Sequence, residues 1–180
     1  MAEEEKKDTW LNYLALTTVI FAVCATLSTF KGGGHSTKSV LSQSQASNQW
    51  AYYQAKSIKG YLYELQQEKL ELELKAADPR VKKLIGEEYQ KKIEGYTAKI
   101  KKYDVEKTKI EQDARAQEKI RDDAQVHSKA FGMAVIFLQI AILLSSIAAL
   151  LKKKIVWITG LATGIVGLVY FANGFLLFWK

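Results

Sequence analysis

Three long apolar segments without a single Asp, Glu, Lys or Arg constrain this chain more than any other feature. They run from Leu11 to Phe30, from Ala130 to Leu151 and from Ile155 to Trp179. A hydrocarbon core about 30 Å thick needs roughly 20 apolar residues in a helix, and a helix satisfies its own backbone polar groups there. Each segment is long enough to cross, so the sequence predicts an all-α, multi-pass membrane protein with three transmembrane helices.

Most charged residues lie between the first and second apolar segments. In a chain of 180 residues, three spans leave no room for a separate globular domain of ordinary size. The acidic leader and the length of the first apolar segment favour an uncleaved anchor over a signal peptide. The expected order is a tail at 1–9, a transmembrane helix at 10–30, a glycine-rich hinge at 31–40, a helical hairpin at 41–129 with its turn at 77–80, a transmembrane helix at 130–151, a basic loop at 152–154 and a transmembrane helix at 155–180.

Small or apolar residues recur along residues 51–76 at alternating spacings of four and three. This heptad pattern is typical of a helix that packs against another helix. The same alternation resumes between Tyr89 and Ala114. The two patterns predict two paired helices, and the residues from Pro79 to Lys129 would project as a coiled-coil stalk of about 75 Å.

The turn between these helices sets the residues that should face each other. Asp78 suits the capping position of a helix and Pro79 its first position. An antiparallel pair centred there places Leu62 opposite Tyr96 and Leu65 opposite Ile93. The expected hairpin seam consists of Ile58, Leu62, Leu65 and Leu72 on the first helix and Ile93, Tyr96, Ile100 and Tyr103 on the second.

Two lysines in this seam, Lys69 and Lys107, suggest that the hairpin does not stand alone. Aromatic and small residues fall on the side of the first helix opposite the seam, where solvent would favour charge. We expect a lateral contact between identical subunits there; tolerated exposed aromatics or a ligand or partner protein are the alternatives. The expected contact residues are Asn48, Trp50, Tyr53, Gln54, Lys56, Ser57 and Gly60.

The segment between the first apolar run and the hairpin contains three consecutive glycines, Gly32, Gly33 and Gly34, followed by His35. Each glycine disfavours helix by about 1 kcal/mol relative to alanine. The sequence therefore predicts a flexible break, with Ser36 or Thr37 capping the helix that restarts after it.

The stretch Ser47-Asn48-Gln49-Trp50-Ala51-Tyr52-Tyr53-Gln54-Ala55-Lys56 resembles the signature S-N-x-W-x-x-Y-Q-A-K of a bacterial membrane family, domain of unknown function 4337. The resemblance covers nearly the whole chain, because members of this family are similar in having one N-terminal span, a charged helical middle and two closely spaced C-terminal spans. The family has no established activity. The resemblance implies a bacterial inner (cytoplasmic) membrane and singles out Asn48, Trp50, Tyr53, Gln54 and Lys56.

No pattern in the sequence predicts catalysis, a cofactor or a metal. Neighbouring carboxylates such as Glu87 and Glu88 diverge by about 100° on a helix and are typical of a solvated surface. A group of His35, Asp123 and His127 could bind a metal or sense pH, but solvated histidines near lipid head groups are the preferred interpretation. The net charge of +7 is spread over a mixed-sign surface, which argues against a nucleic-acid partner.

Small residues and lysines characterise the apolar segments and their ends. Three glycines, Gly160, Gly164 and Gly167, predict close packing of transmembrane helices. Four lysines that flank the spans are expected to contact lipid head groups: Lys129, Lys152, Lys153 and Lys154. The short basic loop at 152–154 favours a cytoplasmic N-terminus with the stalk on the other side, although Lys31 and Lys38 oppose that orientation.

These observations favour a non-enzymatic, homo-oligomeric membrane scaffold with projecting stalks. The alternatives are a small oligomeric channel or transporter and an accessory subunit of a larger membrane complex. The transport hypothesis is less favoured, because the apolar segments contain no ionisable side chain of the kind that lines an ion path. Membrane lipids, further copies of the chain and a protein at the stalk are the expected partners.

Overall fold

A computed structural model describes the backbone of residues 2–179 and the side chains of residues 9–179. The described chain forms three helices, α1 (Ala2–Ala76), α2 (Pro79–Leu151) and α3 (Lys154–Leu176). All three contain a stretch long and apolar enough to cross a membrane. The expected tail is helical from Ala2 onward, while Met1 and Lys180 lie outside the described residues.

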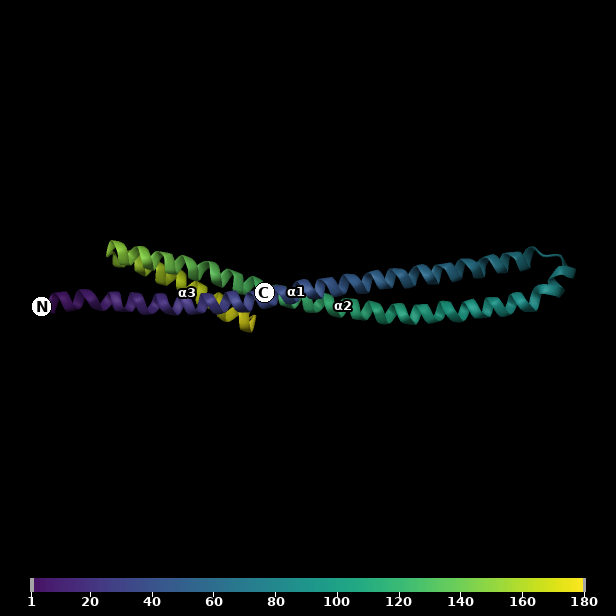
Figure 1. The fold of residues 1–180 in the computed structure, drawn as a ribbon, viewed down its shortest axis with the longest axis horizontal. Helices are drawn as coiled ribbons and strands as arrows, with labels where there is room; N and C mark the ends of the chain where they lie inside the picture. Colours follow the sequence, from purple (N-terminus) through teal and green to yellow (C-terminus); the bar gives the residue numbers. More distant parts are fainter. Residues whose placement is uncertain (1, 180) are drawn as a thin grey trace. The chain divides into compact units, whose positions relative to one another are not determined.

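The chain divides into two compact units, one formed by residues 1–41 with 120–180 and the other by residues 42–119. The first unit contains all three apolar segments, and parts of α1, α2 and α3 lie side by side within it (Figure 1). The second unit contains the remainder of α1 and α2.

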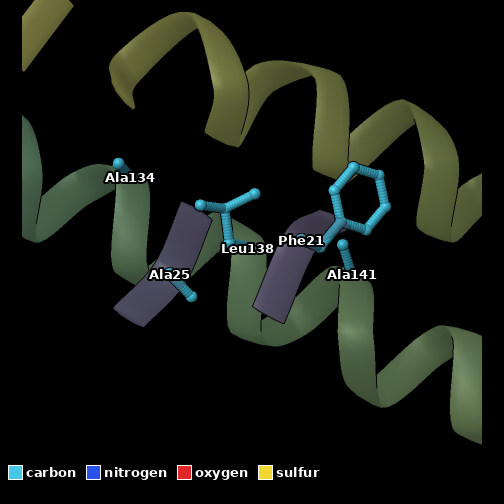
Figure 2. Close-up of a cluster of buried hydrophobic side chains, with 5 residues drawn as sticks. All are labelled: Phe21, Ala25, Ala134, Leu138 and Ala141. Carbon is cyan, nitrogen blue, oxygen red and sulfur yellow. The ribbon is translucent and has the colours of Figure 1, made fainter. Parts of the chain in front are cut away.

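The core of the first unit is built from small residues with a few large side chains between them. Phe21 and Ala25 of α1 pack with Ala134, Leu138 and Ala141 of α2 (Figure 2). From Phe131 onward, the buried positions of α2 recur in steps of three and four, and they are Phe131, Ala134, Leu138, Ala141, Ser145 and Ala148. Small residues at this spacing let helix backbones approach closely, which is how helices associate in lipid.

The predicted break at the three glycines is wrong, because α1 is helical throughout residues 31–40. Gly32 is buried, and a Cβ built on it would lie 3.0 Å from the Cβ atom of Phe131. The Ser128 hydroxyl donates a hydrogen bond to the Gly32 carbonyl at 3.2 Å. This packing against α2 outweighs the low helix propensity of glycine, so Ser36 and Thr37 lie within a helix and cap nothing.

In the second unit, α1 and α2 run antiparallel beside each other (Figure 1). The connection is only Ala77 and Asp78 long, since α1 ends at Ala76 and α2 begins at Pro79. The Asp78 carboxylate accepts a hydrogen bond from the Arg80 backbone N–H at 2.9 Å. Asp78 therefore caps α2 and Pro79 takes the first helical position, as the sequence predicted.

The expected seam on α1 is wrong, whereas the expected face of α2 is the packed one. Large fractions of four seam residues of α1 are exposed: Ile58 60%, Leu62 55%, Leu65 64% and Leu72 64%. The positions of α1 that are buried or half-buried also follow a heptad, which includes Tyr53, Lys56, Gly60 and Tyr63. On α2, the predicted positions Ile93, Tyr96, Ile100 and Tyr103 are all half-buried.

The tip of the unit explains why the pairing differs. The first turns of α2 cross the tip before the helix runs back along α1 (Figure 1), and Leu84 there is 87% exposed. The two helices therefore begin to pair later than a turn centred at Pro79 implies. The Tyr96 hydroxyl reaches Gln66 at 3.5 Å, about one helical turn beyond the expected partner Leu62.

Candidate functional site: surfaces for assembly and lipid contact

An apolar stripe lies on the exposed side of α1 in the second unit. It is named here the α1 stripe and consists of Ala51, Ala55, Ile58, Leu62, Leu65 and Leu72, all of which are exposed. Relative to the helix face that contacts α2, these residues occupy the outermost heptad positions, where a soluble helix pair normally carries charge. The stripe is interrupted by Lys69, whose Nζ atom lies 3.9 Å from Glu73 Oε1 on the same helix.

The outward side of α2 in the same unit has a different composition. Its equivalent positions are mostly polar or charged: Glu88, Lys91, Lys102, Lys109 and Gln112, with Ala98 and Val105 among them. The apolar outer face therefore belongs to α1 alone within this unit. This asymmetry makes the stripe the strongest candidate for a contact with another molecule.

Most residues expected at a lateral subunit contact instead face α2. The Trp50 indole donates a hydrogen bond from Nε1 to Glu118 at 2.9 Å, and the Arg115 guanidinium lies 5.9 Å from the ring centroid. The Trp50 ring also meets Tyr53 edge-on at 5.6 Å. The interpretation of Trp50 and Tyr53 as an outward face was wrong, because this face of α1 is covered by α2.

The remaining expected contact residues divide between the two sides of α1. Lys56 and Gly60 face α2, and Ser57 is half-buried. Asn48 and Gln54 are exposed. Of the fixed positions of the signature, three hold α1 against α2, namely Trp50, Tyr53 and Lys56, whereas Ser47, Asn48, Gln54 and Ala55 are exposed.

Lys56 of α1 forms an ion pair with Glu106 of α2, with Nζ 2.6 Å from Oε2. The hydrogen bond from Lys56 lowers the pKa of Glu106, and the same bond raises the pKa of Lys56. The Lys56 ammonium also lies 5.3 Å from the ring centroids of both Tyr52 and Tyr103. The lysine is therefore held by a carboxylate and two aromatic faces, an arrangement that fixes the register of the pair.

Tyrosines fill the interface on either side of this ion pair. Tyr63 of α1 lies between Tyr96 and Tyr103 of α2, with centroid distances of 5.6 and 5.8 Å. Lys99 lies over the Tyr63 ring at 4.7 Å. Gly60 is buried beneath Tyr103, and a Cβ added at Gly60 would lie 4.0 Å from the Tyr103 Cβ. An interface built from tyrosine, glycine and paired charges does not resemble an apolar heptad in sequence, which is why it was missed.

In the first unit, the three predicted packing glycines of α3 are buried against large side chains. A Cβ at Gly164 would overlap the Phe21 ring, and one at Gly167 would lie 2.8 Å from Leu138 Cγ. Gly160 lies against the Ala141 carbonyl, at 3.3 Å from an added Cβ. The sequence pattern located these glycines, but their partners on α1 and α2 could be found only in the structure.

Aromatic and basic residues mark both ends of the apolar segments in this unit. At one end, the rings of Trp10 and Trp157 lie 6.1 Å apart, and Lys154 lies 5.9 Å from the Trp10 centroid. Lys152 and Lys153 form the connection before α3 and are exposed. Lys129, also exposed, stands directly before the apolar segment of α2. Tryptophan and lysine at such positions are typical of membrane interfaces.

The two histidines stack in the first unit, with ring centroids 4.5 Å apart. His127 Nδ1 lies 2.7 Å from the Gly174 carbonyl of α3, and the His35 ring also stacks on Phe131 at 5.9 Å. Burial, followed by the electrostatic influence of His127, Lys38 and Lys31, lowers the pKa of His35. Among the described residues, no group of three or more His, Cys, Asp or Glu side chains forms a metal cluster, so Asp123 does not complete a metal site with the histidines.

Asn173, a polar residue within the third apolar segment, stabilises the end of α3 rather than a contact with another helix. It is 3% exposed, and its carbonyl accepts the Leu177 backbone N–H at 2.8 Å. Its side-chain Oδ1 accepts the Trp179 backbone N–H at 3.1 Å. An asparagine one turn before the end of an apolar helix is a signal that could have indicated this capping role.

Comparison with known proteins identifies one family. The family described as Domain of unknown function (DUF4337) matches residues 10–177. No curated protein and no solved structure matches the chain. The match covers all three helices and the signature around Trp50.

Proposed function

Because the chain belongs to the family of domain of unknown function 4337, whose description assigns no activity, we propose a function from the structure: a non-enzymatic membrane scaffold that assembles from identical copies. The observation that carries the proposal is the α1 stripe. In this proposal the second unit is a coiled-coil hairpin that projects from the membrane, and its exposed apolar face associates with the same face of other copies.

Heptad spacing supports a helical partner for the stripe. Ala51, Ile58, Leu65 and Leu72 are each seven residues apart, which is the repeat that a second helix needs to follow α1 over three heptads. A single lysine in such a seam, as at Lys69, selects register and oligomeric state at some cost in stability. The regular repeat thus favours a helix over a globular domain as the partner.

Membrane insertion supports a second copy as the source of that helix. All copies inserted in the same direction present the same unit on the same side, and they meet in parallel. The stripe is about 33 Å long and about 10 Å wide, or roughly 330 Å² a copy, which is less than half the area of about 800 Å² per partner that is typical of a stable soluble interface. Confinement in one membrane raises the effective concentration and compensates for the small area.

A polar residue in the first unit also favours self-association. Gln139 lies near the middle of the apolar segment of α2 and is exposed. An amide in contact with acyl chains is costly, whereas a hydrogen bond between helices of two copies would satisfy it. The same exposed amide is the observation that favours the alternative function, a pore between copies, for which ion flux through reconstituted vesicles is the test.

The proposed orientation places the N-terminus and the loop at Lys152 and Lys153 in the cytoplasm. These lysines lie in a short connection, where the positive-inside bias is strongest. Cys24 is the single cysteine and lies within an apolar segment, so a cysteine introduced at Arg80 would be the reactive thiol in water. Labelling of that cysteine in intact cells by an impermeant reagent supports the orientation, and labelling only after lysis contradicts it.

The scaffold itself is tested by the subunit number of the full chain in mild detergent, measured by native mass spectrometry. We expect several copies for the natural chain and a single copy for the double variant Ile58→Glu with Leu65→Glu. The matched control is Ala98→Glu with Val105→Glu, which adds the same charge at equivalent outward positions of α2 and should retain the assembly. A monomeric natural chain, or an unchanged mass for the stripe variant, would contradict the proposal.

A further inference from the structure

A cavity of about 250 Å³ lies between α2 and α3 in the first unit. Val126, Lys129 and Met133 of α2 line one side, and Tyr170 and Asn173 of α3 with Trp179 line the other. The cavity lies where the charged part of α2 meets the apolar segment that starts at Ala130. We propose that this cavity binds an anionic phospholipid, whose head group lies at Lys129.

The aromatic side of the cavity is fixed by a chain reversal after α3. Leu177 has a left-handed backbone with φ of 48°, and its N–H binds the Asn173 carbonyl. The Asn173 side chain then holds the Trp179 backbone at 3.1 Å. Asn173 accepts both hydrogen bonds, one through its backbone carbonyl and one through its side chain. Asn173 therefore determines the position of Trp179.

The chain reversal brings Trp179 into contact with other aromatic rings. The Trp179 ring meets the Tyr170 ring edge-on at 5.4 Å, and Tyr170 stacks on Phe137 of α2 at 5.6 Å and 7°. Trp179 nevertheless remains 45% exposed. A tryptophan that is held in place and still reachable is typical of the layer where head groups meet acyl chains.

The lining has two chemically different ends, and this determines the ligand. Lys129 is exposed and belongs to none of the ion pairs formed by residues 9–179. Val126, Met133 and the aromatic rings surround the rest of the space. A ligand that is anionic at one end and apolar beyond it satisfies both ends. Phospholipids of the surrounding bilayer have this chemistry, and basic cavities between membrane helices are known to select anionic head groups.

Quenching of Trp179 by brominated lipids tests the site in the full chain. The protein is placed in phosphatidylcholine vesicles that contain a minor fraction of brominated phosphatidylglycerol or, in parallel, of brominated phosphatidylcholine. The difference between the natural chain and Trp179→Phe isolates the Trp179 signal from the other tryptophans. We expect brominated phosphatidylglycerol to be enriched about fivefold at Trp179, the value for one lysine beside an anionic lipid.

Two variants separate a cavity from diffuse attraction by surface charge. Lys129→Gln should abolish the preference, and Val126→Phe should also abolish it by filling the space while the charge is kept. Lys38→Gln, which removes an exposed lysine of α1 in the same unit, should leave the preference unchanged. Thermal unfolding shows whether Val126→Phe is folded; if it is not, Val126→Leu replaces it, with a partial loss expected. Equal quenching by both lipids, or a folded filled variant that keeps the preference, would overturn the proposal.

Discussion

The ammonium of Lys56 on α1 lies 2.6 Å from the carboxylate of Glu106 on α2, and this pair determines which side of α1 is covered. Once Lys56 faces α2, Ile58, Leu62 and Leu65 must point away, since they lie on the opposite side of the helix. The polar interface and the exposed apolar stripe are therefore two consequences of one register.

Reversing the charges of the ion pair tests the register. Lys56→Glu and Glu106→Lys should each lower the unfolding temperature, because each places two like charges next to each other. The double variant with both changes should recover most of the loss, since the pair is restored with opposite polarity. Far-UV circular dichroism during heating measures the effect. If the double variant loses as much as the two single variants together, the residues are not partners in solution.

Removing aromatic side chains from the covered face of α1 should weaken the helix pair without separating copies. Trp50→Ala with Tyr53→Ala removes the hydrogen bond to Glu118 and the ring contact between the two residues. We expect a lower unfolding temperature and an unchanged subunit number in native mass spectrometry. Val105→Ala, on the outward face of α2, is the control and should have little effect. Loss of subunits with unchanged stability would restore the outward assignment of Trp50.

Glycine substitutions test the packing of the apolar segments. Gly164→Leu would force the Phe21 ring to move, and overpacking of this kind costs about 1–3 kcal/mol. Gly132→Leu is the matched control, because nothing lies within 4 Å of a Cβ at that position of α2. Thermal unfolding in detergent should therefore separate the two variants. Equal unfolding temperatures for Gly164→Leu and Gly132→Leu would show that α3 does not pack on α1 through Gly164.

Acidification should destabilise the first unit through His35, which lies outside the apolar segment that ends at Phe30. The pKa of His35 is lowered in the folded chain, mainly by burial and then by His127, Lys38 and Lys31. The unfolded chain therefore binds this proton at a higher pH, near 6.5, and stability falls as the pH drops below that value until the folded pKa is passed. Unfolding temperatures measured across this window should vary less for His35→Gln. An identical pH dependence in the natural chain and the variant would assign the effect elsewhere.

Helix content, the three apolar segments, the turn at Asp78 and Pro79, and the packed face of α2 could all be predicted from the sequence. These features depend on local composition and on heptad spacing. The face of α1 that contacts α2 could not be predicted. Two heptad patterns run along α1, and the more apolar pattern lies on the exposed face. Apolar content alone therefore favours the wrong face of α1.

The break at Gly32 was predicted from propensity, and propensity was overridden by contact. Phe131 and Ser128 of α2 lie directly against Gly32, and a larger residue would not fit there. The low helix propensity of this glycine was interpreted as flexibility, whereas its small size permits the close approach of α2. No local pattern distinguishes these two uses of glycine.

Disulfide formation between copies is the sharpest test of assembly through the α1 stripe. In a chain with Cys24→Ala, a cysteine at Leu65 would face the same residue of a second copy if α1 helices associate in parallel, within the Cα separation of about 5.5–6 Å that a disulfide needs. Mild oxidation in the membrane should convert Leu65→Cys to a covalent dimer and leave Val105→Cys monomeric. Absence of the Leu65→Cys dimer, or equal yields from the two positions, would rule out assembly through the α1 stripe.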